Sequence, residues 1–158
     1  MFNIGDKVVY PMHGAGVIEN IEEREISGET VRYYIIKLPM GEMKAMVPLN
    51  KVNEVGLRQV IDEEEILKVF EVLKSESSNM PINWNHRYRA NLEKIKSGSI
   101  FEVAEVVRNL VTRDRQKGLS TGEKKMLENA RRILISELVL AKNVSQNKME
   151  EMLDSYLS

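Results

Sequence analysis

The chain has 158 residues, a net charge of −1 and no cysteine. This length suits one ordinary domain or two small ones with a real apolar core. The lack of cysteine excludes a disulfide framework and any thiolate metal site. The first residues lack the pattern of a secretory signal, and no apolar run approaches the ~18 residues that a membrane span needs. We therefore expect a soluble, cytoplasmic protein.

Charge is unevenly distributed between the two halves of the sequence. Residues 1–79 have a net charge of −5, whereas residues 80–158 have a net charge of +4. The near-neutral total argues against a nucleic-acid binder, but an acidic half joined to a basic half indicates two modules with different partners. Ordinary variation between two soluble modules would give the same split, so charge alone leaves both interpretations open.

Residues 1–60 predict a β-rich module. Apolar and polar residues alternate in short runs, and turn signals that contain glycine separate the runs. In the third run, Tyr34 and Ile36 fall on one face of a strand while Tyr33 and Ile35 fall on the other, which predicts a strand covered on both sides. Four or five such strands predict a small antiparallel barrel or a strongly bent sheet.

Residues 61–158 predict a bundle of helices joined by short loops. The apolar period becomes that of a helix at Asp62, which suits an N-cap and precedes three glutamates in the first turn. Capping-box patterns at Ser99 and Ser120 indicate two further helix starts. The expected helices span about residues 62–74, 81 or 84–96, 99–116, 120–143 and 145–157.

The chain offers few groups for catalysis. Its two histidines, His13 and His86, fall in different modules and lack the spacing of a metal site. The Gly-Ala-Gly of residues 14–16 lies between two predicted strands, so a hairpin turn explains it better than a dinucleotide-binding loop. We therefore expect a binding protein that is not an enzyme, with no metal and no cofactor.

The only tryptophan, Trp84, stands in a polar segment rather than in an apolar run. At helical spacing it shares a face with Tyr88 and Ile95, so it could begin the buried side of a core helix. It could equally be an exposed indole that meets bases while its neighbours reach phosphates, as in proteins that insert an apolar wedge between base steps. These polar and basic neighbours are Asn85, Arg87 and Arg89. The residues alone leave both interpretations open.

Further positive charge lies on the later helices. The segments RDRQKG at residues 113–118 and GEKK at residues 122–125 flank one loop before a helix start. Cationic side chains on both sides of a helix N-terminus predict a phosphate contact, since the free amides there also favour anions. Acidic residues interleave with most of these cations, so a solvated, salt-bridged face is the alternative.

Three long motifs occur in order along the chain: GDKVVYPMHGAGVI at residues 5–18, WNHRYRANLEKI at 84–95 and VAEVVRNLVTRDRQKGLSTGEKKML at 103–127. With them, the sequence resembles the CarD/CdnL family of bacterial transcription regulators essentially from end to end. The first motif also resembles the polymerase-binding module of the transcription-repair coupling factor. The three together are more specific than any one of them, because they are long and keep the family's order.

The resemblance implies an α+β protein without enzymatic activity. Residues 1–60 would form a small antiparallel β-barrel of Tudor or SH3 type that docks on the β subunit of RNA polymerase. Residues 61–158 would form an all-α bundle that contacts promoter DNA at the upstream edge of the melted region. There, a tryptophan wedge in the minor groove would hinder re-annealing and prolong the open complex. We expect a monomer that reaches the nucleoid through RNA polymerase and reads little DNA sequence.

The family's motif W-x-x-R-Y-[KR] falls on residues 84–89, and a further basic position falls in the Gly-Glu-Lys segment. His86 stands where some members have arginine, and an ordinary imidazole is mostly uncharged near neutral pH. The expected DNA contacts are Trp84, Asn85, His86, Arg87, Arg89 and Lys124.

For the N-terminal module, the resemblance implies that Arg24 contacts the polymerase. Met46 replaces a second contacting arginine on the last strand, and its side chain can still pack against a partner. The alternative function is an adaptor that binds polymerase or another protein and has no direct DNA role. A tryptophan emission maximum typical of a fully buried indole, with no quenching by added forked DNA and polymerase, would favour that adaptor.

Overall fold

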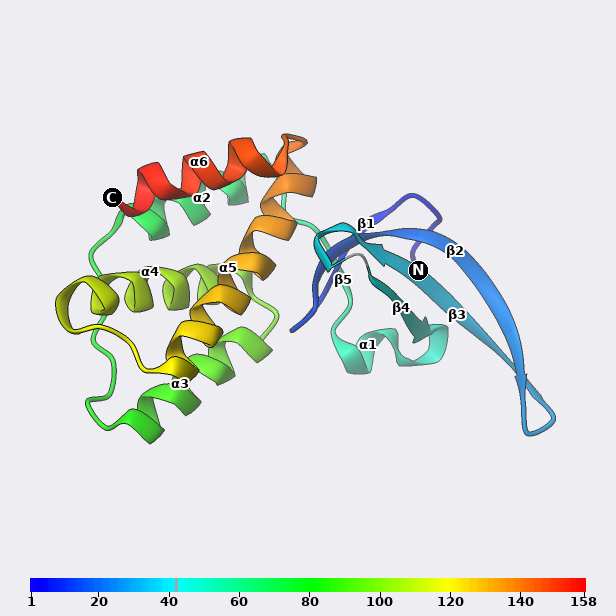
Figure 1. Ribbon diagram of the computed structural model, residues 1–158. Coiled ribbons are helices and arrows are strands. Elements are labelled where there is room, and N and C mark those ends of the chain that lie inside the picture. The colour runs from blue at the N-terminus through cyan, green and yellow to red at the C-terminus, as the bar shows by residue number, and fades with distance from the viewer. Residues whose placement is uncertain (42) are drawn as a thin grey trace.

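The computed structural model describes residues 1–41 and 43–158. Figure 1 shows a strongly curved sheet beside a group of helices, with the long helix α5 running from the helical group to the sheet. The α+β class predicted from the sequence is confirmed. The strands are β1 (Lys7–Tyr10), β2 (Gly14–Ile26), β3 (Glu29–Leu38), β4 (Met43–Pro48) and β5 (Arg58–Gln59).

All strand pairs of the sheet are antiparallel, in the order β4-β3-β2-β1-β5. The pairing of β2 with β3 shifts register between Ile18 and Asn20, and such a bulge bends a strand and increases its twist. The sequence allowed a small barrel or a strongly bent sheet. The bent sheet fits this order, because β4 and β5 lie at opposite edges and, in the part of the chain that the structure describes, do not pair to close a barrel. Short helical turns, η1 (Pro39–Gly41), η2 (Leu49–Lys51) and α1 (Val52–Val55), connect the last strands.

One face of the sheet carries the core of the N-terminal module. Tyr34 and Ile36 of β3 point to this side, as their alternation predicts, and both are fully buried. The other face of β3 holds Ile35, which is buried by its neighbours, while Tyr33 is only half-buried. The strand is therefore covered fully on one side and partly on the other. The members of this core are Val8, Ile18, Tyr34, Ile36, Leu38, Val47 and Leu57.

Five helices follow the sheet: α2 (Glu63–Lys74), α3 (Trp84–Lys96), α4 (Ile100–Lys117), α5 (Thr121–Lys142) and α6 (Gln146–Leu157). Asp62 caps α2 with a complete capping box to Glu65, as predicted. The prediction of a capping box at Ser99 is wrong: among the described residues, the Ser99 side chain makes no hydrogen bond that caps α4. Helix α4 nevertheless begins at Ile100 and ends before Gly118, whose φ is 77°.

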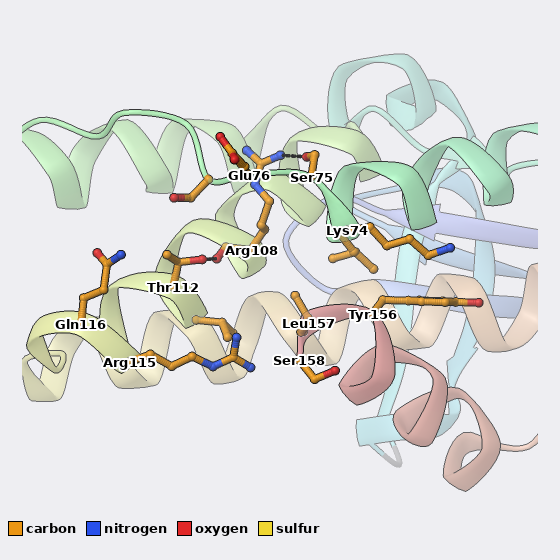
Figure 2. A pocket seen from close by; sticks show the side chains of 13 residues that line it. Lys74, Ser75, Glu76, Arg108, Thr112, Arg115, Gln116, Tyr156, Leu157 and Ser158 are labelled. Carbon is orange, nitrogen blue, oxygen red and sulfur yellow. Dashed lines mark hydrogen bonds between the residues drawn. The ribbon is translucent and has the colours of Figure 1, made fainter.

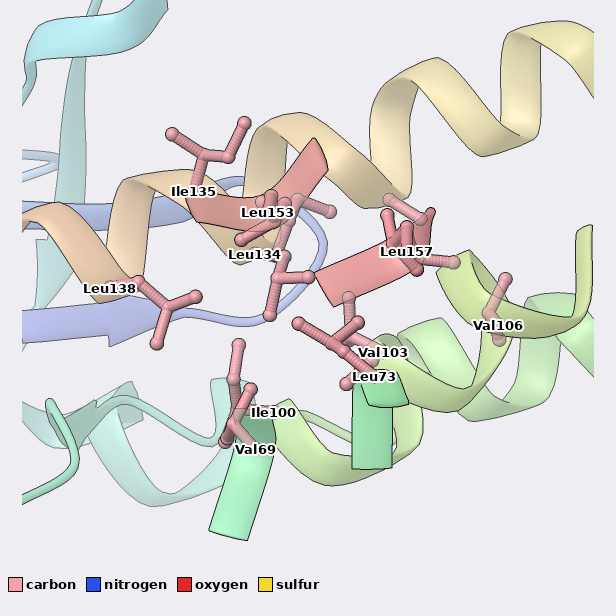
Figure 3. Packing of buried hydrophobic residues seen from close by; sticks show 14 of the residues in the cluster. Val69, Leu73, Ile100, Val103, Val106, Leu134, Ile135, Leu138, Leu153 and Leu157 are labelled. Atoms are coloured by element: carbon pink, nitrogen blue, oxygen red, sulfur yellow. The ribbon is translucent and has the colours of Figure 1, made fainter. Parts of the chain in front are cut away.

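The helices share one apolar core, separate from that of the sheet (Figure 3). Leu73 of α2, Val103 of α4, Leu134 of α5 and Leu153 of α6 all lie in it with at most 2% of their surface exposed. Ile95 of α3 belongs to it as well. Because residues from all five helices fill one interior, the orientation of each helix depends on the others. Helix α5 therefore takes its direction from the bundle as a whole.

The C-terminal half of α5 packs directly against the first hairpin of the sheet. The backbone N–H of Ala15 donates to Ser136 Oγ at 2.8 Å, and this bond is buried. Lys7 Nζ donates to the carbonyl of Leu140 at 2.9 Å. Gly14 lies so close to α5 that an added Cβ would stand 2.8 Å from Ser136 Oγ. The GAG segment thus forms a tight strand-to-helix contact, in keeping with its assignment to a hairpin.

A buried carboxylate on α5 completes this junction. Glu137 is 1% exposed and accepts from both terminal nitrogens of Arg58 at 2.7 Å and from the backbone N–H of Ile61 at 2.9 Å. Arg58 Nε also donates to the carbonyl of Gly98 at 2.9 Å. One arginine at the end of the sheet is therefore tied to both α5 and the loop after α3. This arrangement couples the position of the sheet to that of the helices.

Replacement of Glu137 by glutamine is expected to lower the free energy of unfolding by about 2–3 kcal/mol. The amide loses the charge-assisted pair with Arg58. Its NH2 group also replaces one of the two accepting oxygens, so a buried N–H donor loses its acceptor. Urea unfolding followed by circular dichroism measures the change. Glu128→Gln, an exposed position on the same helix, is the matched control and should stay within about 0.5 kcal/mol of the wild type. Equal stabilities of the two variants would contradict the role given to Glu137.

Candidate functional site

Trp84 is the first residue of α3 and stands at the surface. Asn83 caps this helix, with its side chain accepting from the backbone N–H of His86 at 3.1 Å. Trp84 is 42% exposed, whereas Ile95 on the same stripe is 2% exposed. The core interpretation of Trp84 is therefore wrong: the stripe is buried at its far end and opens to solvent at the tryptophan.

The exposed indole is nevertheless supported from behind. Its ring stacks on Tyr88, with centroids 5.1 Å apart and planes inclined by 21°. Its Nε1–H donates to Ser120 Oγ, the N-cap of α5, at 2.9 Å. A Cβ added at Gly122 would lie 3.5 Å from Trp84 Cζ2, so α5 approaches the indole closely at this glycine. The indole is thus clamped between α3 and α5 with one edge free.

Arg87, three residues after Trp84, is buried rather than at the surface. Its Nε donates to Glu123 Oε2 at 2.7 Å and its Nη2 to Oε1 at 3.1 Å, and the side chains are only 3% and 2% exposed. Hydrogen bonds from Arg87 hold the pKa of the Glu123 carboxyl below its usual value, against the opposing effect of burial. The same pair raises the pKa of Arg87. Both groups are therefore charged at neutral pH.

The other residues expected to contact DNA are exposed. Asn85, His86 and Arg89 lie on the outer side of α3, with Arg89 three and four residues after the other two and so on the same face. Lys124 lies on α5 four residues after Ser120, which holds the indole. The Trp84–Ser120 bond therefore brings the two sequence segments together at one edge of the bundle. Arg87 alone among the six is directed inward.

The loop before α3 adds an apolar side chain that the sequence analysis did not single out. Ile82 is 95% exposed two residues before Trp84, and its carbonyl accepts from Arg87 Nη1 at 2.9 Å. The same loop borders a hollow of about 220 Å³ whose lining includes Arg113 and Lys117. Two of the cations expected to flank a phosphate therefore lie near this edge as well.

A second candidate surface lies on the sheet, on the face opposite the core of the N-terminal module. Arg24 of β2 and Met46 of β4 both line a shallow hollow of about 470 Å³, together with Ile35 of β3. Arg24 is 56% exposed and pairs with Glu22 at 3.1 Å, while Met46 is 42% exposed. The structure thus brings the two residues expected to bind polymerase to one face, around a hollow whose other lining residues are mostly polar or charged.

Another hollow of the helical module is lined by residues of α2, α4 and α6 (Figure 2). Its most prominent cation, Arg108, donates to the carbonyl of Val72, to Ser75 Oγ and Ser78 Oγ, and twice to Asn109 Oδ1. All five of its N–H groups therefore have protein partners. Arg108 ties the segment after α2 to α4, and its bonds leave no donor for an anion.

Comparison with known proteins identifies both modules. A family model described as "CarD, C-terminal domain" matches residues 68–154, and one described as "CarD-like/TRCF RID domain" matches residues 2–61. The chain belongs to the CarD family. A Bacillus subtilis (strain 168) protein named "Putative transcription factor YdeB" is 41% identical over 150 residues, which cover 95% of this chain and 98% of that protein.

One solved structure also matches part of this chain. The solution NMR structure of the 72-residue N-terminal domain of Myxococcus xanthus CarD matches 37% of this chain and 79% of that domain. Its sequence identity is 29% and its TM-score is 0.33.

CarD is a family of non-enzymatic transcription factors, and RID in the name of the second model denotes an RNA polymerase-interacting domain. In this CarD-family chain, residues 1–41 and 43–158 contain no group of three His, Asp or Glu side chains placed to hold a metal ion. None of the helices described is both long and apolar enough to cross a membrane.

Proposed function

We propose that this protein bridges RNA polymerase and promoter DNA and stabilises the open complex. The sheet face around Arg24 and Met46 binds the polymerase β subunit, and the edge formed by α3 and α5 contacts DNA at the upstream end of the bubble. The observation that carries the proposal is the half-exposed indole of Trp84, clamped by Tyr88 and Ser120 on two helices that also carry exposed polar and cationic side chains.

The geometry of Trp84 suits a wedge. A wedge must enter a base step from the minor groove, and unstacking costs a few kcal/mol that other contacts have to offset. An indole that is already fixed loses little conformational freedom on binding, so more of its stacking energy stabilises the complex. The exposed part of the indole offers an apolar surface, while Tyr88 stacks on one face of the ring.

Phosphate contacts supply the remaining affinity. Arg89 and Lys124 are exposed on the two helices that hold the indole, and Asn85 and His86 add exposed polar groups on α3. Such contacts position a protein without reading sequence. In this assignment Arg87 supports the wedge from within, because its guanidinium is committed to Glu123. The expected result is weak, salt-dependent DNA binding in the minor groove with little sequence preference.

Attachment to polymerase makes this weak affinity sufficient. The sheet tethers the helical module near the promoter, and a tether of this kind raises the effective DNA concentration to the millimolar range. The bonds of Arg58, Glu137 and Ser136 couple the two modules, so the docked sheet also sets the direction of the wedge. One copy supplies both surfaces, in line with a monomer.

The polymerase-binding face is tested by reversing the charge of Arg24. Arg24→Glu is expected to weaken the association with the polymerase β subunit about tenfold or more, since a like charge at an interface built for arginine costs binding energy. Arg32→Glu is the matched control: this arginine is also 56% exposed, on the neighbouring strand, but does not line the hollow. Biolayer interferometry with the isolated β lobe gives both affinities. Equal losses in the two variants would refute this docking face.

A further inference from the structure

Ser120 has a hydrogen-bond arrangement that a simple helix cap does not need. Its hydroxyl accepts from Trp84 Nε1 at 2.9 Å and from the backbone N–H of Glu123 at 3.2 Å, and it donates to Glu123 Oε1 at 3.3 Å. A serine hydroxyl offers one donor and two acceptor positions, so all three are in use. Because both lone pairs accept N–H groups, the hydroxyl proton is directed to the Glu123 carboxylate.

The carboxylate that receives this proton is itself fixed. Glu123 is 2% exposed and is held by two nitrogens of Arg87, which is 3% exposed. Arg87 Nη1 also donates to the carbonyl of Ile82, in the loop that leads into α3. A continuous chain of bonds therefore runs from the indole N–H through Ser120 and Glu123 to Arg87, and back to the backbone two residues before the indole.

We infer that Ser120, held by the Glu123–Arg87 pair, is the positioning residue that sets the orientation of the Trp84 indole and keeps its N–H away from DNA. This inference rests on the proposed wedge and concerns which base pairs the wedge accepts. The minor groove offers acceptors at adenine N3 and thymine O2, whereas guanine adds an amino donor. An indole with a free N–H would favour A·T pairs through those acceptors. With the N–H bound to Ser120, the wedge presents an apolar edge that tolerates any pair.

The test compares three variants of the full chain. Ser120→Ala removes the acceptor, Ser120→Thr keeps a hydroxyl, and Ser145→Ala removes an equivalent cap. Ser145 accepts from Lys148 N at 3.1 Å at the start of α6, so its loss matches the capping cost without touching Trp84. The two measurements are the lifetime of the open promoter complex and the time-resolved fluorescence anisotropy of the only tryptophan. The lifetimes use two promoters that differ only in an A·T or G·C pair at the upstream edge of the bubble.

Ser120→Ala should shorten the open-complex lifetime about fivefold on the G·C promoter and less on the A·T promoter, with a new fast component in the indole anisotropy. Ser120→Thr should restore both values, and Ser145→Ala should leave both at the wild-type level. A purely structural role for Ser120 predicts the same lifetimes for both alanine variants, which would overturn the inference. If Trp84→Ala leaves the lifetime unchanged, the proposed wedge is refuted. If Trp84→Ala shortens the lifetime and Ser120→Ala does not, the wedge stands and only the positioning role of Ser120 is refuted.

Discussion

Replacement of Trp84 by alanine is expected to shorten the lifetime of the open promoter complex about tenfold while leaving polymerase binding unchanged. Stacking of an aromatic side chain on a base contributes about 1–3 kcal/mol, and 1.4 kcal/mol corresponds to a factor of ten. The indole lies on α3, whereas the proposed polymerase-binding face around Arg24 lies on the sheet, so its loss leaves that face intact. Lifetimes are measured as the decay of preformed complexes after a competitor is added.

Leu67→Ala provides the control for this variant. Leu67 is another apolar side chain of the helical module, 62% exposed on α2, and it has no place in the proposed DNA edge. Its removal should leave the open-complex lifetime unaltered. A Trp84→Ala protein that binds polymerase normally and sustains wild-type lifetimes would falsify the wedge and favour the adaptor function.

Replacement of Arg87 by methionine is expected to lower the free energy of unfolding by about 3–5 kcal/mol. The change strands the Glu123 carboxylate, which is 2% exposed, without its partner, and an unpaired buried charge is costly. Arg89→Met is the matched control, since this arginine is exposed two residues further along the same helix. It should keep full stability and lose a phosphate contact. Urea unfolding and DNA affinity at low salt separate the two effects.

A second replacement and a pH series sharpen this prediction. Adding Glu123→Leu to Arg87→Met removes both charges and should recover much of the lost stability. Because the folded pKa of Glu123 is lowered, its pair stabilises the protein fully above the unfolded pKa of about 4.3. That contribution is lost as the pH falls through the folded value. The difference between wild type and Arg87→Met should therefore shrink in acid. A stable Arg87→Met protein with weakened DNA binding would instead make Arg87 a phosphate contact.

Most of the fold follows from local signals in the sequence. Helix α2 begins where Asp62 and its glutamates predict, and α4 ends at Gly118, because caps and glycines act over a few residues. The two-residue strand β5 and the four-residue helix α1 were not predicted individually, since such short elements show no period. The capping box at Ser99 did not form, although the helix did, because packing of its apolar face decides whether a helix persists.

The candidate site was harder to predict because its geometry depends on contacts between helices. The motif places Arg87 and Arg89 two residues apart, and sequence gives both the same role, yet a helix turns them about 200° apart and buries one. The pattern Ser120-x-x-Glu123 predicts a capping box. Its serine does cap α5, but the glutamate turns to Arg87 instead of the cap backbone. Only the meeting of α3 and α5 assigns these side chains to the support of Trp84.

The most direct test of the bridge is the lifetime of the open complex on a promoter that melts poorly, with and without the wild-type protein at saturating concentration. The protein should lengthen this lifetime, and Arg24→Glu at the same concentration should lose most of the gain, because the wedge then lacks its tether. An open complex that decays at the same rate with and without bound protein would contradict the account.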